Sequence, residues 1–187
     1  MDYRVFNYLK KNFPTDPVQV DRLFVSAYLE DNSFDVCKNI LLKEYQIERI
    51  GSQEHVLLTE FLDVVHRYTD KVNLEALIEL FEFVISPEDR MVNGAVYTPA
   101  SIRDYIVKES LSRLPYTKDF AVADISCGCG GFLYTAAKLL NKRYGLKYYD
   151  IFRKHLYGLD IQEYAVRRTR LLLSILALEN GEDRKEF

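Results

Sequence analysis

Apolar positions through the first half of the chain recur every three or four residues, which is the spacing of an amphipathic α-helix. Three stripes are well developed, and each predicts a helix that buries one face. They consist of Val20, Leu23, Phe24, Ala27 and Tyr28; of Leu57, Leu58, Phe61, Val64, Val65 and Tyr68; and of Leu74, Leu77, Ile78, Phe81, Val84 and Ile85. Asn73 stands where an N-cap belongs, and a weaker helical pattern runs over residues 34–50. We therefore expect packed helices in this half.

The pattern changes after Ser86-Pro87, because the residue before a proline disfavours the helical conformation. We place a domain boundary there, with a helical domain over residues 1–88 and a second domain over 89–187. The second domain alternates helices with short, continuously apolar runs, as buried parallel strands do. Its expected elements are a helix from about Pro99, a strand over 120–125, a helix ending at Tyr144, a strand over 156–161 and a helix from about Glu163. The predicted fold class of this domain is α/β.

A glycine-rich turn, VADISCGCGGFLYTAAKLL over residues 122–140, joins the first of these strands to the next helix. Its glycines, Gly128, Gly130 and Gly131, permit positive φ and close approach of the backbone to a ligand. Alone, such a turn fits a dinucleotide, a nucleotide phosphate, S-adenosylmethionine or a merely structural connection. A GxGxxG motif would need glycine where Leu133 stands, and no Lys-Ser or Lys-Thr pair closes a phosphate loop. Phosphate binding is therefore disfavoured.

Polar residues at the ends of neighbouring elements complete a candidate ligand site. Asp160 ends the second apolar run, where a carboxylate can accept hydrogen bonds from both ribose hydroxyls of an adenosine-containing ligand. Asp124 ends the first run, and it either bears on the ligand or only pins the glycine turn. Thr98 and Pro99 are typical of an N-cap and a first helical residue, so the amide groups there suit a carboxylate. Tyr97 adds a ring face or a hydroxyl.

Composition and charge limit the function classes. The chain has 187 residues, 48% hydrophobic and 28% charged, which predicts a globular protein. Its net charge of −3 argues against a free-standing nucleic-acid grip, so DNA contact is expected to need other sequence. We expect a cytoplasmic protein without a membrane span or a metal site. The cations Lys142, Arg143, Lys147, Arg167, Arg168 and Arg170 fit solvated helix faces better than a rim for DNA.

Three segments together, GAVYTPASI, DISCGCGGFL and YGLDIQEYAVRRTRLLL, resemble successive motifs of adenine-specific (N6) DNA methyltransferases of restriction-modification systems. The likeness is closest to type I modification subunits and fused type II enzymes, and it covers roughly residues 91–180. It implies a class I, Rossmann-like methyltransferase fold that binds S-adenosyl-L-methionine. It also implies DNA as substrate and specificity and restriction subunits as partners.

The resemblance assigns a role to each matching residue. The methionine end of the cofactor would meet Tyr97, Thr98 and Pro99. The glycine loop under the cofactor would consist of Asp124, Ser126, Cys127, Gly128 and Gly130, and the ribose and adenine edge would meet Asp160 and Ile161. The sequence departs from the family pattern at Ile125, where proline is usual, and at Cys129, where a small hydroxylated residue is commoner.

The family's catalytic loop, Asn or Asp followed by Pro-Pro and an aromatic residue, does not occur in the 187 residues. We therefore expect the amino-terminal, cofactor-binding part of an enzyme, with no catalytic residue in this chain and no activity by itself. A sheet without its later strands would also expose an unpaired edge and an apolar face. Two alternatives stay open: a non-catalytic binding or assembly module, and a methyltransferase that acts on RNA or protein.

Overall fold

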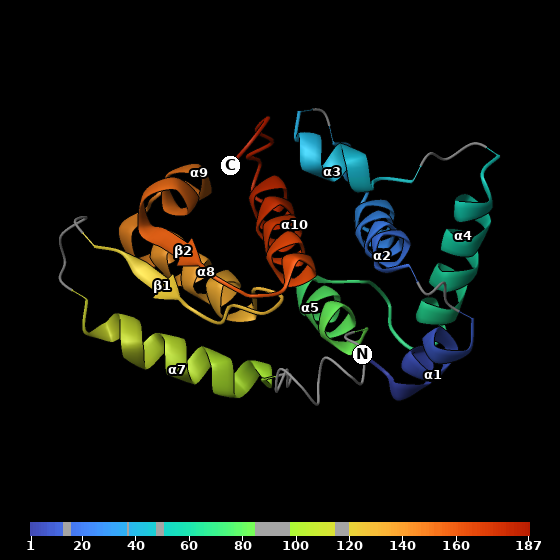
Figure 1. Ribbon diagram of the computed structural model, residues 1–187, viewed down its shortest axis with the longest axis horizontal. Helices are drawn as coiled ribbons and strands as arrows, with labels where there is room; N and C mark the ends of the chain where they lie inside the picture. The colour runs from blue at the N-terminus through green and yellow to red at the C-terminus, as the bar shows by residue number, and fades with distance from the viewer. Residues whose placement is uncertain (13–15, 37, 48–50, 85–97, 115–119) are drawn as a thin grey trace. The chain divides into compact units, whose positions relative to one another are not determined.

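The computed structural model describes residues 1–12, 16–36, 38–47, 51–84, 98–114 and 120–187 (Figure 1). The chain forms two compact units, Met1–Gly94 and Ala95–Phe187. The boundary predicted between residues 88 and 89 lies outside the described residues.

The first unit is helical throughout its described part. Its helices are α1 (Tyr3–Asn12), α2 (Pro17–Asp31), α3 (Ile40–Tyr45), α4 (Gln53–His66) and α5 (Leu74–Phe83). Side chains cap the first turns of α2, α3, α4 and α5, and the predicted N-cap Asn73 is confirmed by its bond from the Ala76 amide. α3 is shorter than the pattern over 34–50 predicts, because its capping residue, Asn39, starts the helix only at Ile40.

Helix α2 supplies the centre of this unit's core. It packs against α3, α4 and α5, and the ring of Phe24 lies 5.7 Å from that of Phe61 and 6.2 Å from that of Phe81. The predicted apolar stripes therefore bury most of their members against one another. Two members of the stripe that was predicted from Leu57 to Tyr68 are not buried. Leu57 is exposed, and Tyr68 lies beyond the end of α4 and is also exposed.

The second unit combines helices with a two-stranded parallel sheet. Its elements are α7 (Ala100–Ser112), β1 (Val122–Asp124), α8 (Gly131–Tyr144), α9 (Tyr148–Asp150), the π-helical turn η1 (Ile151–His155), β2 (Leu156–Gly158) and α10 (Glu163–Glu179). In the sheet, Val122 pairs with Leu156, Ala123 with Tyr157 and Asp124 with Gly158. Helix α8 packs on both strands, and α7 and α10 pack on α8 (Figure 1). The carboxyl ends of both strands therefore meet at one edge.

The strands are shorter and more exposed than the sequence predicts. Each regular strand has three residues, although bonds between Leu159 and Asp124 and between Cys127 and Leu159 continue the pairing. Ile125 is 78% exposed and Ile161 85% exposed, so the prediction of fully buried strands is wrong. The physical reason is that, within the described residues, α8 covers one face of the sheet, whereas a continuous apolar run is typical of strands covered on both.

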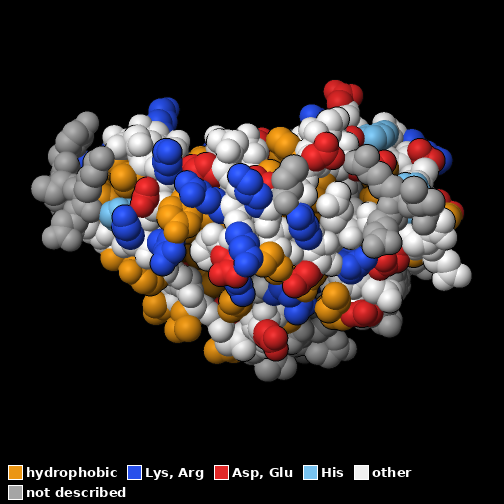
Figure 2. Space-filling view, turned by 90° about the horizontal axis from the view of Figure 1, so that it is seen from above, with side chains coloured by type: hydrophobic (Ala, Val, Ile, Leu, Met, Phe, Trp, Pro, Cys, Tyr) orange, Lys and Arg blue, Asp and Glu red, His pale blue; other side chains and the backbone are white. Residues whose placement is uncertain are grey.

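The uncovered face is the apolar surface that the sequence led us to expect. Alternate residues of the two chain segments point away from α8 and are exposed, among them Ala123, Ile125, Tyr157 and Leu159. In Figure 2, hydrophobic side chains gather over the left-hand part of the surface, where the second unit lies. This surface borders the edge at which the two strands end.

The buried phenol of Tyr148 makes the stability of the second unit change with pH in the alkaline range. Tyr148 is 4% exposed, and burial raises its pKa from 10.0 to about 12. In the unfolded chain this phenol loses its proton first, so the free energy of unfolding should fall as pH rises from about 10 to 12. We expect Tyr148→Phe to flatten that decline, measured as urea midpoints at several pH values. Tyr157→Phe, which removes an exposed hydroxyl, is the control, and equal slopes in wild type and Tyr148→Phe would contradict the expectation.

Candidate functional site

The glycine loop leaves the carboxyl end of β1 and enters α8. Gly128 has φ +51° and Gly130 has φ +89°, so both use a backbone conformation that side chains disfavour. Gly130 is the N-cap of α8 and supplies no side-chain cap, which leaves amide donors at the first turn. Gly131, the third glycine of the turn, does not use positive φ and is an ordinary first residue of the helix.

Asp160 meets this loop directly. One carboxylate oxygen, Oδ2, accepts a hydrogen bond from the Gly128 amide at 2.9 Å, and Oδ1 accepts from the Gln162 amide at the same distance. A carboxylate has about four lone-pair positions, so two bonds leave capacity for further donors. The structure thus brings Gly128 and Asp160, 32 positions apart in the sequence, into one cluster at the edge of the sheet.

Asp124 pins the loop. Its Oδ1 accepts a hydrogen bond from the Ser126 amide at 3.1 Å, and its carbonyl accepts from the Leu159 amide at 2.9 Å. The first bond fixes the start of the loop, and the second joins the end of β1 to the segment that follows β2. Ser126 is exposed, as is Ile161, the residue after Asp160.

The two cysteines of the loop are buried beneath it. Burial raises the pKa of the Cys127 thiol, while a weak contact of its Sγ with the Thr169 hydroxyl at 3.9 Å opposes that rise. A thiol that holds its proton is a poor nucleophile, so Cys127 acts here as a packing residue. Cys129 is also buried, so its departure from the family pattern fills space below the loop.

Gly158 and Thr169 support the loop and were missed in the sequence. A Cβ on Gly158 would lie 2.6 Å from Leu133 Cδ1 and 3.3 Å from Cys127 Sγ, so a larger residue at the end of β2 would displace the Leu133 side chain. A glycine at the end of an apolar run is itself a signal of close backbone approach. Thr169 lies in α10, and its hydroxyl donates to the Gly128 carbonyl at 2.9 Å. No pattern in the sequence marks that contact.

The predicted start of α7 is shifted by one residue. Thr98 was expected as N-cap and Pro99 as first helical residue, whereas Pro99 is the N-cap and the helix begins at Ala100. Pro99 has an extended ψ of 139°, and its carbonyl accepts bonds from Ile102 and Arg103, which defines the cap one position later. Tyr97 lies outside the described residues.

A buried arginine ties the first turn of α7 to the first turn of α8. Arg103 is 1% exposed, and its Nε donates to Thr135 Oγ1 at 2.8 Å. The Thr135 hydroxyl in turn donates to Asp104 at 2.9 Å. The amino-terminal ends of α7 and α8 therefore lie together, which places Thr98 and Pro99 at the same end of the unit as the glycine loop.

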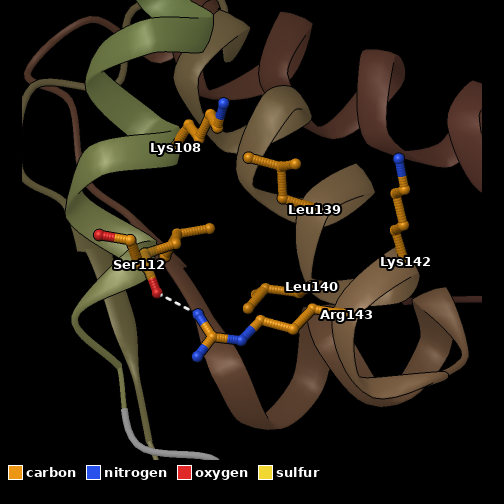
Figure 3. A pocket seen from close by; sticks show the side chains of 7 residues that line it. Lys108, Ser112, Leu139, Leu140, Lys142 and Arg143 are labelled. Carbon is orange, nitrogen blue, oxygen red and sulfur yellow. Dashed lines mark hydrogen bonds between the residues drawn. The ribbon is translucent and has the colours of Figure 1, made fainter.

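A hollow lies at the carboxyl-terminal ends of α7 and α8, away from the glycine loop (Figure 3). It encloses about 410 Å³, and it is lined by Lys108, Leu111, Ser112, Leu139, Leu140, Lys142 and Arg143. Arg143 donates to the carbonyls of Leu111 and Leu114, the latter at 2.9 Å, and so caps the end of α7. Because roughly two to three helical turns separate this hollow from Gly131, it is not part of the glycine-loop cluster.

The cations considered as a rim for DNA differ in burial and in their contacts. Lys142 and Arg143 line the hollow at the carboxyl-terminal ends of α7 and α8. Arg168 is buried, and its guanidinium lies 5.0 Å from the centre of the Tyr164 ring, so neither a solvated face nor a DNA rim describes it. Lys147 and Arg170 are exposed, as expected of solvated positions.

Neither a metal-binding cluster nor a membrane-spanning helix occurs among the described residues. They hold no group of three or more His, Cys, Asp or Glu side chains arranged to bind a metal ion. None of the helices in this part of the chain is long and apolar enough to cross a membrane.

Comparison with known proteins relates the chain to one family. The model of the N-6 DNA methylase family matches residues 72–185, more than half of the chain. The match begins just before α5 and includes the glycine loop, β2 and α10. Comparisons with curated proteins and with solved structures gave no match.

Proposed function

The chain belongs to the N-6 DNA methylase family, and from that premise we propose that its second unit is the S-adenosyl-L-methionine-binding part of a DNA adenine-N6 methyltransferase. Membership implies methyltransferase activity on DNA adenine for the family. The observation that carries the proposal is the Asp160 carboxylate, which is held against the glycine loop at the edge where both parallel strands end. The cofactor, when bound, would supply the methyl group.

The residues around Asp160 suit an adenosine-containing ligand. The carboxylate has lone pairs left to accept from ribose hydroxyls, and the adjoining Ile161 offers an apolar side chain that the described fold does not bury. Gly128 and Gly130 let the ligand approach the backbone closely, and Ser126 exposes a hydroxyl beside them. We propose the remaining loop residues, Asp124 and Cys127, as supports of this site.

We propose that Tyr97, Thr98 and Pro99 serve the methionine end of the cofactor. The bond between Arg103 and Thr135 supports this, because it keeps the start of α7 beside the start of α8. Amide groups at a helix amino terminus favour a carboxylate.

At the level of the whole chain, we propose a helical domain over residues 1–88 and a class I, Rossmann-like methyltransferase domain over residues 89–187. The parallel register of β1 and β2, joined through α8, supports the second assignment. We further propose a restriction-modification setting, with specificity and restriction subunits as partners. Without the Asn/Asp-Pro-Pro-aromatic loop, these 187 residues are expected to bind the cofactor but not to transfer its methyl group.

Calorimetric titration tests the proposal. We expect saturable, one-site binding of S-adenosyl-L-methionine and of its demethylated product, because both carry the ribose and adenine that Asp160 and Ile161 would meet. ATP and NAD, which share the adenosine but add phosphates, serve as controls and should bind more weakly, since the loop lacks a phosphate-binding motif. Preferred binding of ATP or NAD, or no binding of S-adenosyl-L-methionine by the folded protein, would overturn the proposal.

A further inference from the structure

Thr169 makes a hydrogen bond outside its own helix. A threonine hydroxyl within a helix can bond to a carbonyl of the same helix, three or four residues earlier. The Thr169 hydroxyl instead leaves α10 and donates to the carbonyl of Gly128 at 2.9 Å. Thr169 is 5% exposed, so this bond is shielded from water.

Gly128, whose carbonyl accepts this bond, is hydrogen-bonded through both its amide and its carbonyl. The Gly128 amide donates to Asp160 at 2.9 Å, and the Gly128 carbonyl accepts from Thr169. Glycine loses more backbone freedom on ordering than other residues, and Gly128 is ordered at a φ of +51°. Two bonds from the segment that runs from β2 into α10 therefore fix the most mobile type of residue in one conformation.

The same threonine also packs under the next glycine of the loop. A Cβ added to Gly130 would lie 2.9 Å from Thr169 Oγ1, 3.0 Å from its Cγ2 and 3.1 Å from its Cα. The loop thus rests on α10 at Gly130, while Cys127 Sγ lies 3.9 Å from the same hydroxyl. Three loop residues meet one side chain.

We propose that Thr169 is a positioning residue, which holds the glycine loop in its cofactor-binding shape before the cofactor arrives. This role rests on the proposed function of the loop. A loop that is ordered in advance binds more tightly, because less conformational entropy is lost on binding. Thr169 therefore raises affinity through Gly128 and Gly130 and without touching the ligand.

Paired substitutions separate the hydroxyl from the volume of the side chain. Thr169→Val keeps the shape but leaves the Gly128 carbonyl without its donor, whereas Thr169→Ser keeps the hydroxyl. Ser174→Ala is the control, because it removes another buried hydroxyl from α10. We expect Thr169→Val to weaken binding of S-adenosyl-L-methionine about two- to tenfold, the effect of one lost hydrogen bond, and Thr169→Ser to restore it.

Amide hydrogen exchange of the unliganded protein supplies a readout that does not depend on the cofactor. The amides of Gly128 and Gly130 should exchange faster in Thr169→Val than in wild type, Thr169→Ser or Ser174→Ala. Unchanged exchange in Thr169→Val, or a failure of Thr169→Ser to restore it, would overturn the positioning role. If wild type binds no cofactor while exchange still accelerates in Thr169→Val, the proposed function fails and the ordering of the loop by Thr169 stands.

Discussion

Gly130→Ala is expected to lower the free energy of unfolding of the second unit by about 2–4 kcal/mol, the sum of backbone strain and overpacking. Gly130 has φ +89°, which an alanine adopts only at a cost. Its new Cβ would lie 3.1 Å from the Cα of Thr169, a backbone atom of α10 that cannot rotate away. The loop and α10 must then separate, so cofactor binding should be lost together with stability.

The opposite end of the same helix provides a matched control. Gly145, the C-cap of α8, has φ +64°, and a Cβ there would meet nothing within 4 Å. Gly145→Ala therefore carries the backbone strain without the collision and should cost about 1–2 kcal/mol. Urea unfolding of both variants, followed by circular dichroism, measures the difference. Equal losses in the two variants would show that close approach to Thr169 is not what requires glycine at position 130.

Asp160→Ala is expected to weaken binding of S-adenosyl-L-methionine about 100-fold, because charge-assisted hydrogen bonds contribute roughly 1.5–3 kcal/mol each. Two effects combine in this variant. The proposed bonds to the ribose disappear, and the Gly128 amide loses its acceptor at 2.9 Å. Calorimetric titration beside wild type measures the loss.

Two further variants show which effect dominates. Asp160→Asn keeps an oxygen for the Gly128 amide but loses the charge, so it should bind more tightly than Asp160→Ala and less tightly than wild type. Asp150→Ala removes a half-buried carboxylate that pairs with Lys154 at 2.9 Å, and it should leave affinity unchanged. If Asp160→Ala bound S-adenosyl-L-methionine as tightly as wild type, the proposal that the cofactor binds at this edge of the sheet would be wrong.

Prediction from the sequence succeeded where the signal is local. The repeat of apolar residues along α2, α4 and α5 reports which side of each helix is buried, because 3.6 residues per turn connects spacing to face directly. Asn73 was identified as an N-cap for a similar reason, since its side chain bonds to an amide three residues later. The ends of the buried stripes and of the helices were predicted less well, as the exposed Leu57 and the N-cap Pro99 show. Packing against neighbouring elements determines where burial stops and where a helix begins, and residue spacing does not report it.

The sequence by itself determined the helical first half and the α/β pattern of the second, because periodicity acts through the backbone. It also singled out Gly128, Gly130 and Asp160 as candidate ligand residues, and the structure joins Gly128 to Asp160 by a hydrogen bond. Only the tertiary structure decided that position 158 lies so close to Leu133 that a Cβ there would displace the Leu133 side chain. It also decided that Thr169 supports Gly128 from 41 positions away. Such contacts depend on which helix packs on which strand, and the spacing of residues along the chain does not predict that packing.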